Sequence, residues 1–208
     1  MNSVNQITKR VRARKLTNIA AYLVLIIPLL NCSPTVYTPP ETLGIQNQSR
    51  TVEYNQSINV IWSQLTDYIR QSSYGIDSMD TDSYYAEISF VTKDFHKYLD
   101  GGILKEGGFN GYEGDLLEFI LPTSDYKSSL SCTIRIQLSQ KSLKTTILSF
   151  KVYYETKYAK KKREVLSEFT FDSEDPMVIP SDDPAINYTL APSYLLEKQL
   201  FKTFSNFK

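Results

Sequence analysis

The sequence predicts an α+β protein in which one antiparallel sheet of about six to seven strands carries two helices on one face. Three late segments alternate apolar and polar residues, as strands with one buried side do. Two other segments, residues 58–69 and residues 196–207, repeat apolar residues at helical spacing. These patterns predict a layer of helices packed on a sheet.

Residues 50–55 form a short predicted strand, and Ser57 then stands where a helix N-cap is expected. The following apolar residues are spaced i, i+3, i+4, i+7 and i+11, which predicts an amphipathic helix that ends near Ser73, before Gly75. This predicted stripe consists of Ile58, Ile61, Trp62, Leu65 and Ile69.

Residues 74–79 and 84–92 are predicted to pair as a hairpin, with a turn through residues 80–83. The acidic residues Asp77, Asp80 and Asp82 suggest calcium as an alternative reading. An EF-hand loop also needs Gly at its sixth position and Glu at its twelfth, and no register here supplies both. We therefore expect a polar hairpin tip and no metal site.

Residues 132–139, 148–154 and 165–171 are the clearest predicted strands. Cys132 falls on the apolar side of the first of them, which predicts a buried free thiol. Residues 172–187 are expected to be irregular, and a helix is predicted over residues 192–207 with Pro192 in its first turn. The apolar stripe of that helix is Leu196, Leu200, Phe204 and Phe207.

The charge distribution argues against nucleic-acid binding. The chain of 208 residues has 23 basic residues, and five of them lie within residues 1–31, where there is no acidic residue. The rest of the chain has 18 basic and 23 acidic residues and is mildly acidic, whereas a nucleic-acid-binding protein needs a basic face. A single histidine, His96, excludes His-rich metal sites, and no motif places a nucleophile beside it, so no cofactor and no catalytic set are expected.

Residues 1–31 are predicted to be a signal peptide. Basic residues precede an apolar run over residues 19–30, which is shorter than the about 20 residues that a membrane-spanning helix needs. The sequence Leu29-Leu30-Asn31-Cys32-Ser33 then resembles the lipobox of bacterial lipoproteins, although Leu30 and Asn31 depart from the usual small residues. The resemblance implies a thioether-linked diacylglycerol on Cys32, cleavage before it and acylation of the new terminus.

Three acyl chains on Cys32 would hold the protein on a membrane. Ser33 resembles the signal for sorting to the outer membrane, where the protein would face the periplasm. The inner membrane and the surface leaflet are alternative locations. A plain signal peptide and an uncleaved anchor are alternatives to the lipobox. Residues 32–49 contain Pro34, Pro39 and Pro40 and are expected to be a tether, followed by a single domain over residues 50–208.

The predicted order of elements resembles the helix-grip architecture, including modules of the lipoproteins in the outer-membrane β-barrel assembly machine (the BamC or NlpB type). More narrowly, residues 58–62, 98–102 and 193–197 resemble a group of uncharacterised proteobacterial lipoproteins. That group usually has Asp-Cys-Gly in the second stretch and another Cys before the last helix. Gly101 stands at the first position here, so the corresponding disulfide is absent, and the resemblance implies no known activity.

Two further segments are candidates for contact with a partner. Residues 101–114 hold six of the eight glycines, which predicts a flexible surface loop; as a recognition loop it would present Phe109 and Tyr112. A basic run is expected to be a charged hairpin tip, or alternatively a contact for anionic headgroups or lipopolysaccharide phosphates. This run consists of Lys157, Lys160, Lys161, Lys162 and Arg163.

We therefore expect a non-enzymatic, membrane-anchored lipoprotein whose periplasmic domain binds envelope proteins or other envelope components. The alternative is a pocket between the sheet and the terminal helix that binds a lipid or another apolar ligand. An enzyme would have to work through Asp, Glu, Tyr or Ser.

Overall fold

The structure, a computed structural model, describes residues 34–44, 50–108, 111–120, 126–160, 165–180 and 185–207. The chain divides into two compact units, residues 1–36 with 104–114 and residues 37–103 with 115–208. The described residues form mostly antiparallel strands with a few helices, which confirms the predicted α+β class. None of their helices is long and apolar enough to span a membrane.

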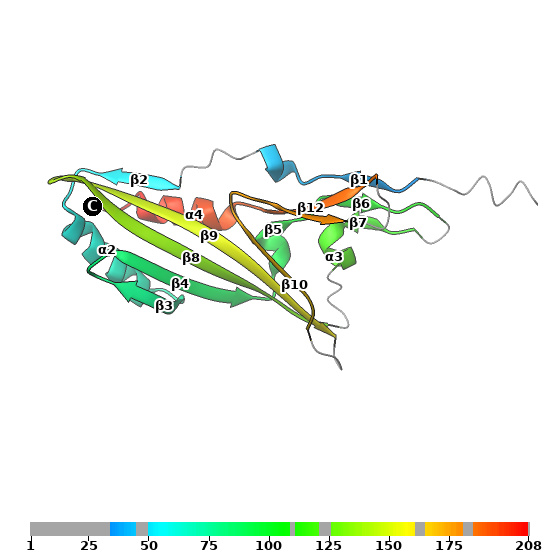
Figure 1. The fold of residues 1–208 in the computed structure, drawn as a ribbon, viewed down its shortest axis with the longest axis horizontal. Coiled ribbons are helices and arrows are strands. Elements are labelled where there is room, and N and C mark those ends of the chain that lie inside the picture. The colour runs from blue at the N-terminus through cyan, green and yellow to red at the C-terminus, as the bar shows by residue number, and fades with distance from the viewer. Residues whose placement is uncertain are drawn as a thin grey trace, which may run out of the picture. The chain divides into compact units, whose positions relative to one another are not determined.

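The second unit is built on a six-stranded antiparallel sheet in the order β10-β9-β8-β4-β3, in which β2 also pairs with β9 (Figure 1). The two longest strands lie at its centre, and Figure 1 shows them running side by side. Its members are β2 (Thr51–Tyr54), β3 (Gly75–Asp80), β4 (Tyr85–Thr92), β8 (Tyr126–Ser142), β9 (Thr145–Lys160) and β10 (Val165–Asp172).

The alternation seen in the sequence fixes which side of this sheet is buried. Ile88 of β4, Ile134 of β8 and Val152 of β9 lie opposite one another across three strands, and each is fully buried. Cys132, two residues before Ile134, is on the same side and is a buried free thiol, as predicted. Burial raises the pKa of this thiol to about 12, so it stays protonated and unreactive at neutral pH.

Two helices bury their apolar stripes in the core that this side of the sheet forms. The first stripe is confirmed, because α2 (Ile58–Gln71) buries all its predicted positions. The second is confirmed in part: α4 (Leu195–Phe204) buries Leu196, Leu200 and Phe204, whereas Phe207 lies beyond the end of the helix and is only partly buried. Ser57 directly precedes α2 as expected, but its side chain makes no capping hydrogen bond. Instead its carbonyl oxygen accepts from the N–H groups of Val60 and Ile61.

The predicted start of the last helix is wrong. Pro192 ends the strand β12 (Asn187–Pro192), where it lies opposite Leu99 of β5 (Leu99–Asp100). A proline is tolerated at the end of a strand because no ladder hydrogen bond has to come from its nitrogen. The segment expected to be irregular also contains β11 (Met177–Pro180), which pairs with β12, so a second sheet in the order β11-β12-β5 forms.

The glycine-rich segment is not a plain loop, contrary to expectation. It contains β6 (Ile103–Lys105) and β7 (Glu113–Asp115), and α3 (Leu116–Ile120) follows. Within the first unit, the Glu106 N–H donates to the Tyr112 carbonyl at 2.7 Å, and Lys105 pairs with Glu113 at 2.8 Å. These contacts close a hairpin that glycine content alone did not reveal.

The stretch predicted to be a tether contains β1 (Val36–Thr38) and a 3-10 turn (Glu41–Gly44). The Tyr37 hydroxyl lies 3.0 Å from the carbonyl oxygen of Gly101 and accepts from the N–H of Thr189 at 2.8 Å. Gly102 has a φ of +73°, and a Cβ there would collide with the carbonyl of Thr38. Residues 37–40 of the second unit therefore lie against its body; the predicted boundary at residue 50 stays a prediction.

Candidate functional site

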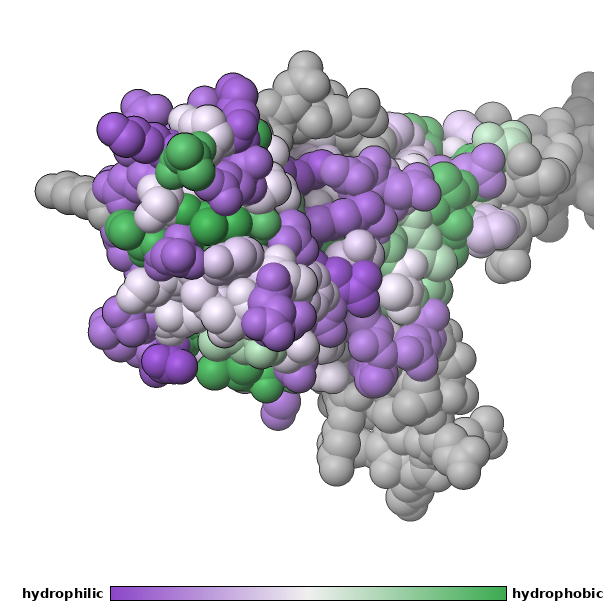
Figure 2. All heavy atoms as spheres, turned by 60° about the vertical axis from the view of Figure 1, so that its left-hand side comes forward, coloured by the Kyte–Doolittle hydropathy of each residue, from purple (hydrophilic) through white to green (hydrophobic). Residues whose placement is uncertain are grey.

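Apolar patches and hollows are the surface features that most often bind a partner or a ligand. On the face shown in Figure 2, the hydrophobic residues of the described part form small areas that hydrophilic residues separate. Single exposed apolar side chains of this kind are ordinary for a folded protein and indicate no interface by themselves. A hollow of about 540 Å³ lies at the edge of the main sheet.

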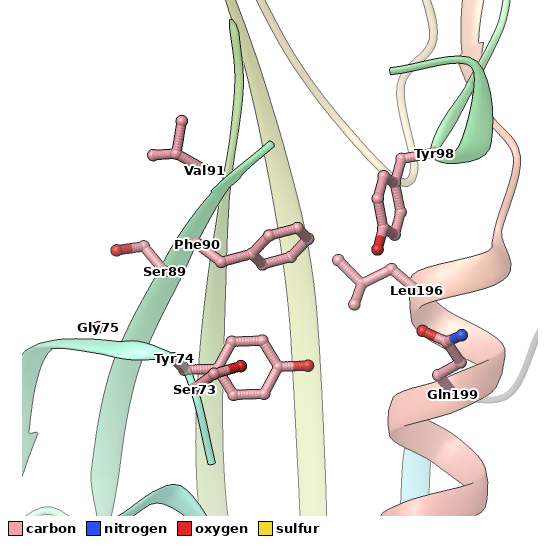
Figure 3. Close-up of a pocket in the computed structure, with 9 residues that line it drawn as sticks. All are labelled: Ser73, Tyr74, Gly75, Ser89, Phe90, Val91, Tyr98, Leu196 and Gln199. Carbon is pink, nitrogen blue, oxygen red and sulfur yellow. The ribbon is translucent and has the colours of Figure 1, made fainter. Parts of the chain in front are cut away.

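This hollow, the β4–α4 cleft, lies between the ends of β3 and β4 on one side and α4 on the other (Figure 3). Its volume is about 540 Å³, within the range of about 300–1,000 Å³ that is usual for ligand sites. All its lining residues belong to the second unit. They are Ser73, Tyr74, Gly75, Ser89, Phe90, Val91, Tyr98, Leu196 and Gln199.

Aromatic rings form the inner wall of the cleft. The ring centroid of Phe90 lies 5.8 Å from that of Tyr74 and 5.4 Å from that of Tyr98. Figure 3 shows the Phe90 and Tyr74 rings pointing toward α4, with Leu196 facing them. The alternation of β4 places Phe90 on the core side, and Leu196 belongs to the first turn of α4. Burial raises the pKa of the Tyr74 hydroxyl, so this hydroxyl stays uncharged.

The polar groups of the cleft are neutral. They come from Ser73, Ser89, Gln199 and the two tyrosines, and none of the described lining residues is an acid or a base of the Asp, Glu, Lys, Arg or His type. Hydroxyl and amide groups of this kind orient a ligand by hydrogen bonds. The arrangement suits a ligand that combines an apolar group with uncharged donors and acceptors.

A buried carboxyl group, which sequence reasoning missed, lies in α4 directly after Leu196. Glu197 is 1% exposed, and the Tyr154 hydroxyl donates to its Oε1 at 2.8 Å. Its Oε2 has no hydrogen-bond partner in the described part of the chain. Burial raises the pKa of this carboxyl group above its ordinary value. Nothing in the sequence separates Glu197 from a surface glutamate of an amphipathic helix.

The opposite side of the main sheet carries charges that neutralise one another. Arg50 pairs with Glu174 at 2.9 Å, and Lys151 bridges Asp172 and Glu174. A second hollow here, of about 300 Å³, is lined partly by these side chains. Because its cations already have carboxylate partners, this hollow does not offer a site for an anion.

A further pair on the same side links the guanidinium of Arg135 to Glu87 at 2.6 Å. The same guanidinium lies 4.4 Å from the ring centroid of Tyr153. These contacts join side chains of β4, β8 and β9 on this face.

None of the predicted site residues that the structure describes is among the lining residues of the cleft. Tyr112 belongs to the first unit, and Phe109 lies outside the described residues. Lys157 is exposed and pairs with Glu155 at 2.6 Å, so a lipid phosphate would have to displace that carboxylate. Lys160 ends β9, and its side chain lies outside the described part, as do Lys161, Lys162, Arg163 and the predicted lipidation residue Cys32.

His96 lies beside Asp115, with its Nδ1 3.2 Å from the carboxylate Oδ2. The Asp115 Oδ1 accepts from the N–H of Leu117, which places this carboxylate at the start of α3. Among the described residues, no group of three or more His, Cys, Asp or Glu residues is arranged to hold a metal ion. The hairpin turn at residues 80–83 is confirmed, because Asp80 accepts there from the N–H of Asp82 and the hydroxyl of Ser83.

Comparison with protein-family models, with curated proteins and with solved structures gives no match for this chain.

Proposed function

We propose that this protein is a lipoprotein, anchored to a membrane by acyl chains on Cys32, whose domain is a non-enzymatic binding module with the β4–α4 cleft as its binding site. In this proposal the domain faces the periplasm from the outer membrane and binds an envelope protein or another envelope component. The sheet and its terminal helix are arranged as a helix grip, with the cleft between them.

The observation that carries the proposal is the composition of the cleft. An apolar wall of Phe90, Tyr98 and Leu196 faces a hollow of about 540 Å³, and its described polar groups are neutral. Binding sites are typically apolar hollows with a few placed polar groups. General acid–base chemistry needs a group whose pKa lies near the working pH, and the described lining residues supply hydroxyl and amide groups instead. Recognition is therefore the function that this site supports best.

The anchor is tested by mass spectrometry of the mature protein from its native membrane. We expect the chain to begin at Cys32 with a diacylglyceryl group on the sulfur and an acyl group on the amine. The C32S variant should remain an uncleaved precursor. A native chain that begins at Met1 without acyl groups would refute the anchor.

The cleft is tested by site-specific photo-crosslinking in cells. A photoreactive side chain at Gln199, which is exposed on α4 and lines the cleft, should capture the bound component. The matched control is Lys198, which is exposed on the same helix and outside the cleft lining. We expect an adduct from position 199 only. Equal adducts from both positions, or none from position 199, would count against the cleft as the binding site.

A second candidate function is a pocket for a lipid or another small apolar ligand. The aromatic wall favours it, since Tyr74, Phe90 and Tyr98 offer a continuous apolar surface to an acyl chain or a ring. Native mass spectrometry of the purified protein distinguishes this candidate, because a small ligand would add its mass to that of the chain.

A further inference from the structure

We infer that the component bound in the β4–α4 cleft is an uncharged saccharide unit of an envelope glycan. The C–H groups of the sugar would pack against the aromatic wall, and its hydroxyl groups would pair with the hydroxyl and amide groups of the cleft. This inference rests on the proposed function of the cleft and names the class of its ligand. It follows from the polar groups that surround the apolar wall.

Polar side-chain groups approach the cleft from both of its sides. Figure 3 shows the Tyr74 hydroxyl directed toward α4, and the Gln199 amide directed from α4 into the cleft. The Tyr98 hydroxyl points toward Leu196, which lies between the two sides. A hydroxyl and a carboxamide can each donate and accept hydrogen bonds. Donors and acceptors of both kinds therefore surround one apolar wall, which is the combination that a sugar ring requires.

The charge of the lining favours a neutral ligand. None of the described lining residues is acidic or basic. Two lysines are close in the chain but outside the lining: Lys97, whose Nζ lies 5.7 Å from the ring centroid of Tyr98, and Lys198, next to Gln199. A phosphate or a carboxylate in the cleft would lose water without gaining an ionic partner there. Uncharged sugars do not meet this cost, so we exclude phosphorylated and acidic sugars as well as phospholipid headgroups.

The polar groups also disfavour a purely apolar ligand such as an acyl chain. An acyl chain would pack against Phe90 and Leu196 but would cover the Tyr98 hydroxyl and the Gln199 amide without offering them a hydrogen bond. Polar groups that lose water in this way and gain no partner oppose binding. A sugar ring has both C–H groups for the wall and hydroxyl groups for these side chains.

The course of the chain before β3 disfavours an added peptide strand. Gly75 pairs with Ser89, and the two preceding residues, Ser73 and Tyr74, line the cleft themselves. They take the place along β4 that a peptide would need for pairing with the sheet. A peptide bound without such pairing would have to satisfy its regularly spaced N–H and C=O groups with a few side chains. Sugar hydroxyl groups both donate and accept, so they match side-chain hydroxyl and amide groups more readily.

The rim of the cleft is accessible, so the bound sugar can belong to a longer glycan. Leu196 of the wall is buried, whereas several residues at the rim are exposed. These exposed lining residues are Ser73, Gly75, Val91 and Gln199. A glycan would therefore place one unit against the wall and leave the neighbouring units in solvent.

The test first identifies what the photoreactive side chain at position 199 captures in cells. After protease digestion of the adduct, tandem mass spectrometry should show the loss of whole, uncharged sugar residues. A captured peptide, a captured lipid, or a captured sugar that carries phosphate or carboxylate would overturn the inference and leave the cleft as a binding site. The absence of any adduct would overturn the proposed function itself.

The captured oligosaccharide is then released, purified and titrated into the purified full-length protein by calorimetry. Gln199→Leu removes the amide and Tyr98→Phe removes only the hydroxyl, so we expect each to lower the affinity about tenfold. Lys198→Leu, at an exposed position on α4 outside the lining, is the matched control and should bind as the wild type does. Equal affinities for the wild type and both cleft variants would show that the sugar binds elsewhere and would overturn the inference.

Discussion

Replacing Glu197 with Gln is expected to stabilise the protein at alkaline pH and to flatten the dependence of its stability on pH. The Gln side chain keeps the shape of the carboxyl group and can still accept the hydrogen bond that Tyr154 donates to Oε1. It removes a group that must either stay protonated or carry a buried charge.

The direction follows from proton linkage. Burial raises the pKa of Glu197 above the ordinary value of 4.5 in the folded chain, and its hydrogen bonds and the nearby cations offset only part of that rise. At a pH between the unfolded and folded pKa values, the folded state binds more protons than the unfolded state. The free energy of unfolding therefore falls as pH rises from about 4.5 through the folded pKa, by about 1.4 kcal/mol for each unit of separation.

Urea unfolding of the wild type and of Glu197→Gln near about pH 4 and near about pH 8 measures this difference. We expect similar stabilities at the lower pH and a more stable variant at the higher pH. Glu118→Gln, at an exposed position on α3, is the matched control and should follow the wild type at both values. If the wild type and the Glu197 variant lost or gained the same stability between the two pH values, Glu197 would not be the buried group that binds a proton in the folded state.

Replacing Phe204 with Ala is expected to lower the free energy of unfolding by about 3–5 kcal/mol, the usual loss for a fully buried phenylalanine. The Phe204 side chain is 0% exposed. Its ring centroid lies 5.5 Å from that of Phe150 and 6.0 Å from that of Tyr68, so it joins α4 to the sheet and to α2. The substitution removes this ring and leaves a cavity in the core that the neighbouring side chains fill only in part.

Phe201→Ala is the matched control, because Phe201 belongs to the same helix and is only partly buried. Its loss should be clearly smaller in the same denaturant measurement. Because α4 forms one wall of the cleft, Phe204→Ala should also weaken crosslinking from position 199. A Phe204 variant as stable as the Phe201 variant would show that α4 does not depend on this contact.

The sequence alone determined the features that depend on neighbouring residues in the chain. The stripe from Ile58 to Ile69 predicted α2, and the alternation around Cys132 predicted both a strand of the main sheet and the buried thiol. Helical and strand periods place side chains on one face whatever lies opposite, so such patterns can be read locally.

Which distant segments meet could be seen only in the folded chain. The cleft joins Tyr74, which precedes β3, with Phe90 of β4 and Leu196 of α4, three residues from separate parts of the chain. Pro192 is in a strand because Leu99 lies opposite it, and Glu197 is buried because Tyr154 and the core cover it. Burial, pairing and pKa depend on what packs against a residue, and that is a property of the folded chain as a whole.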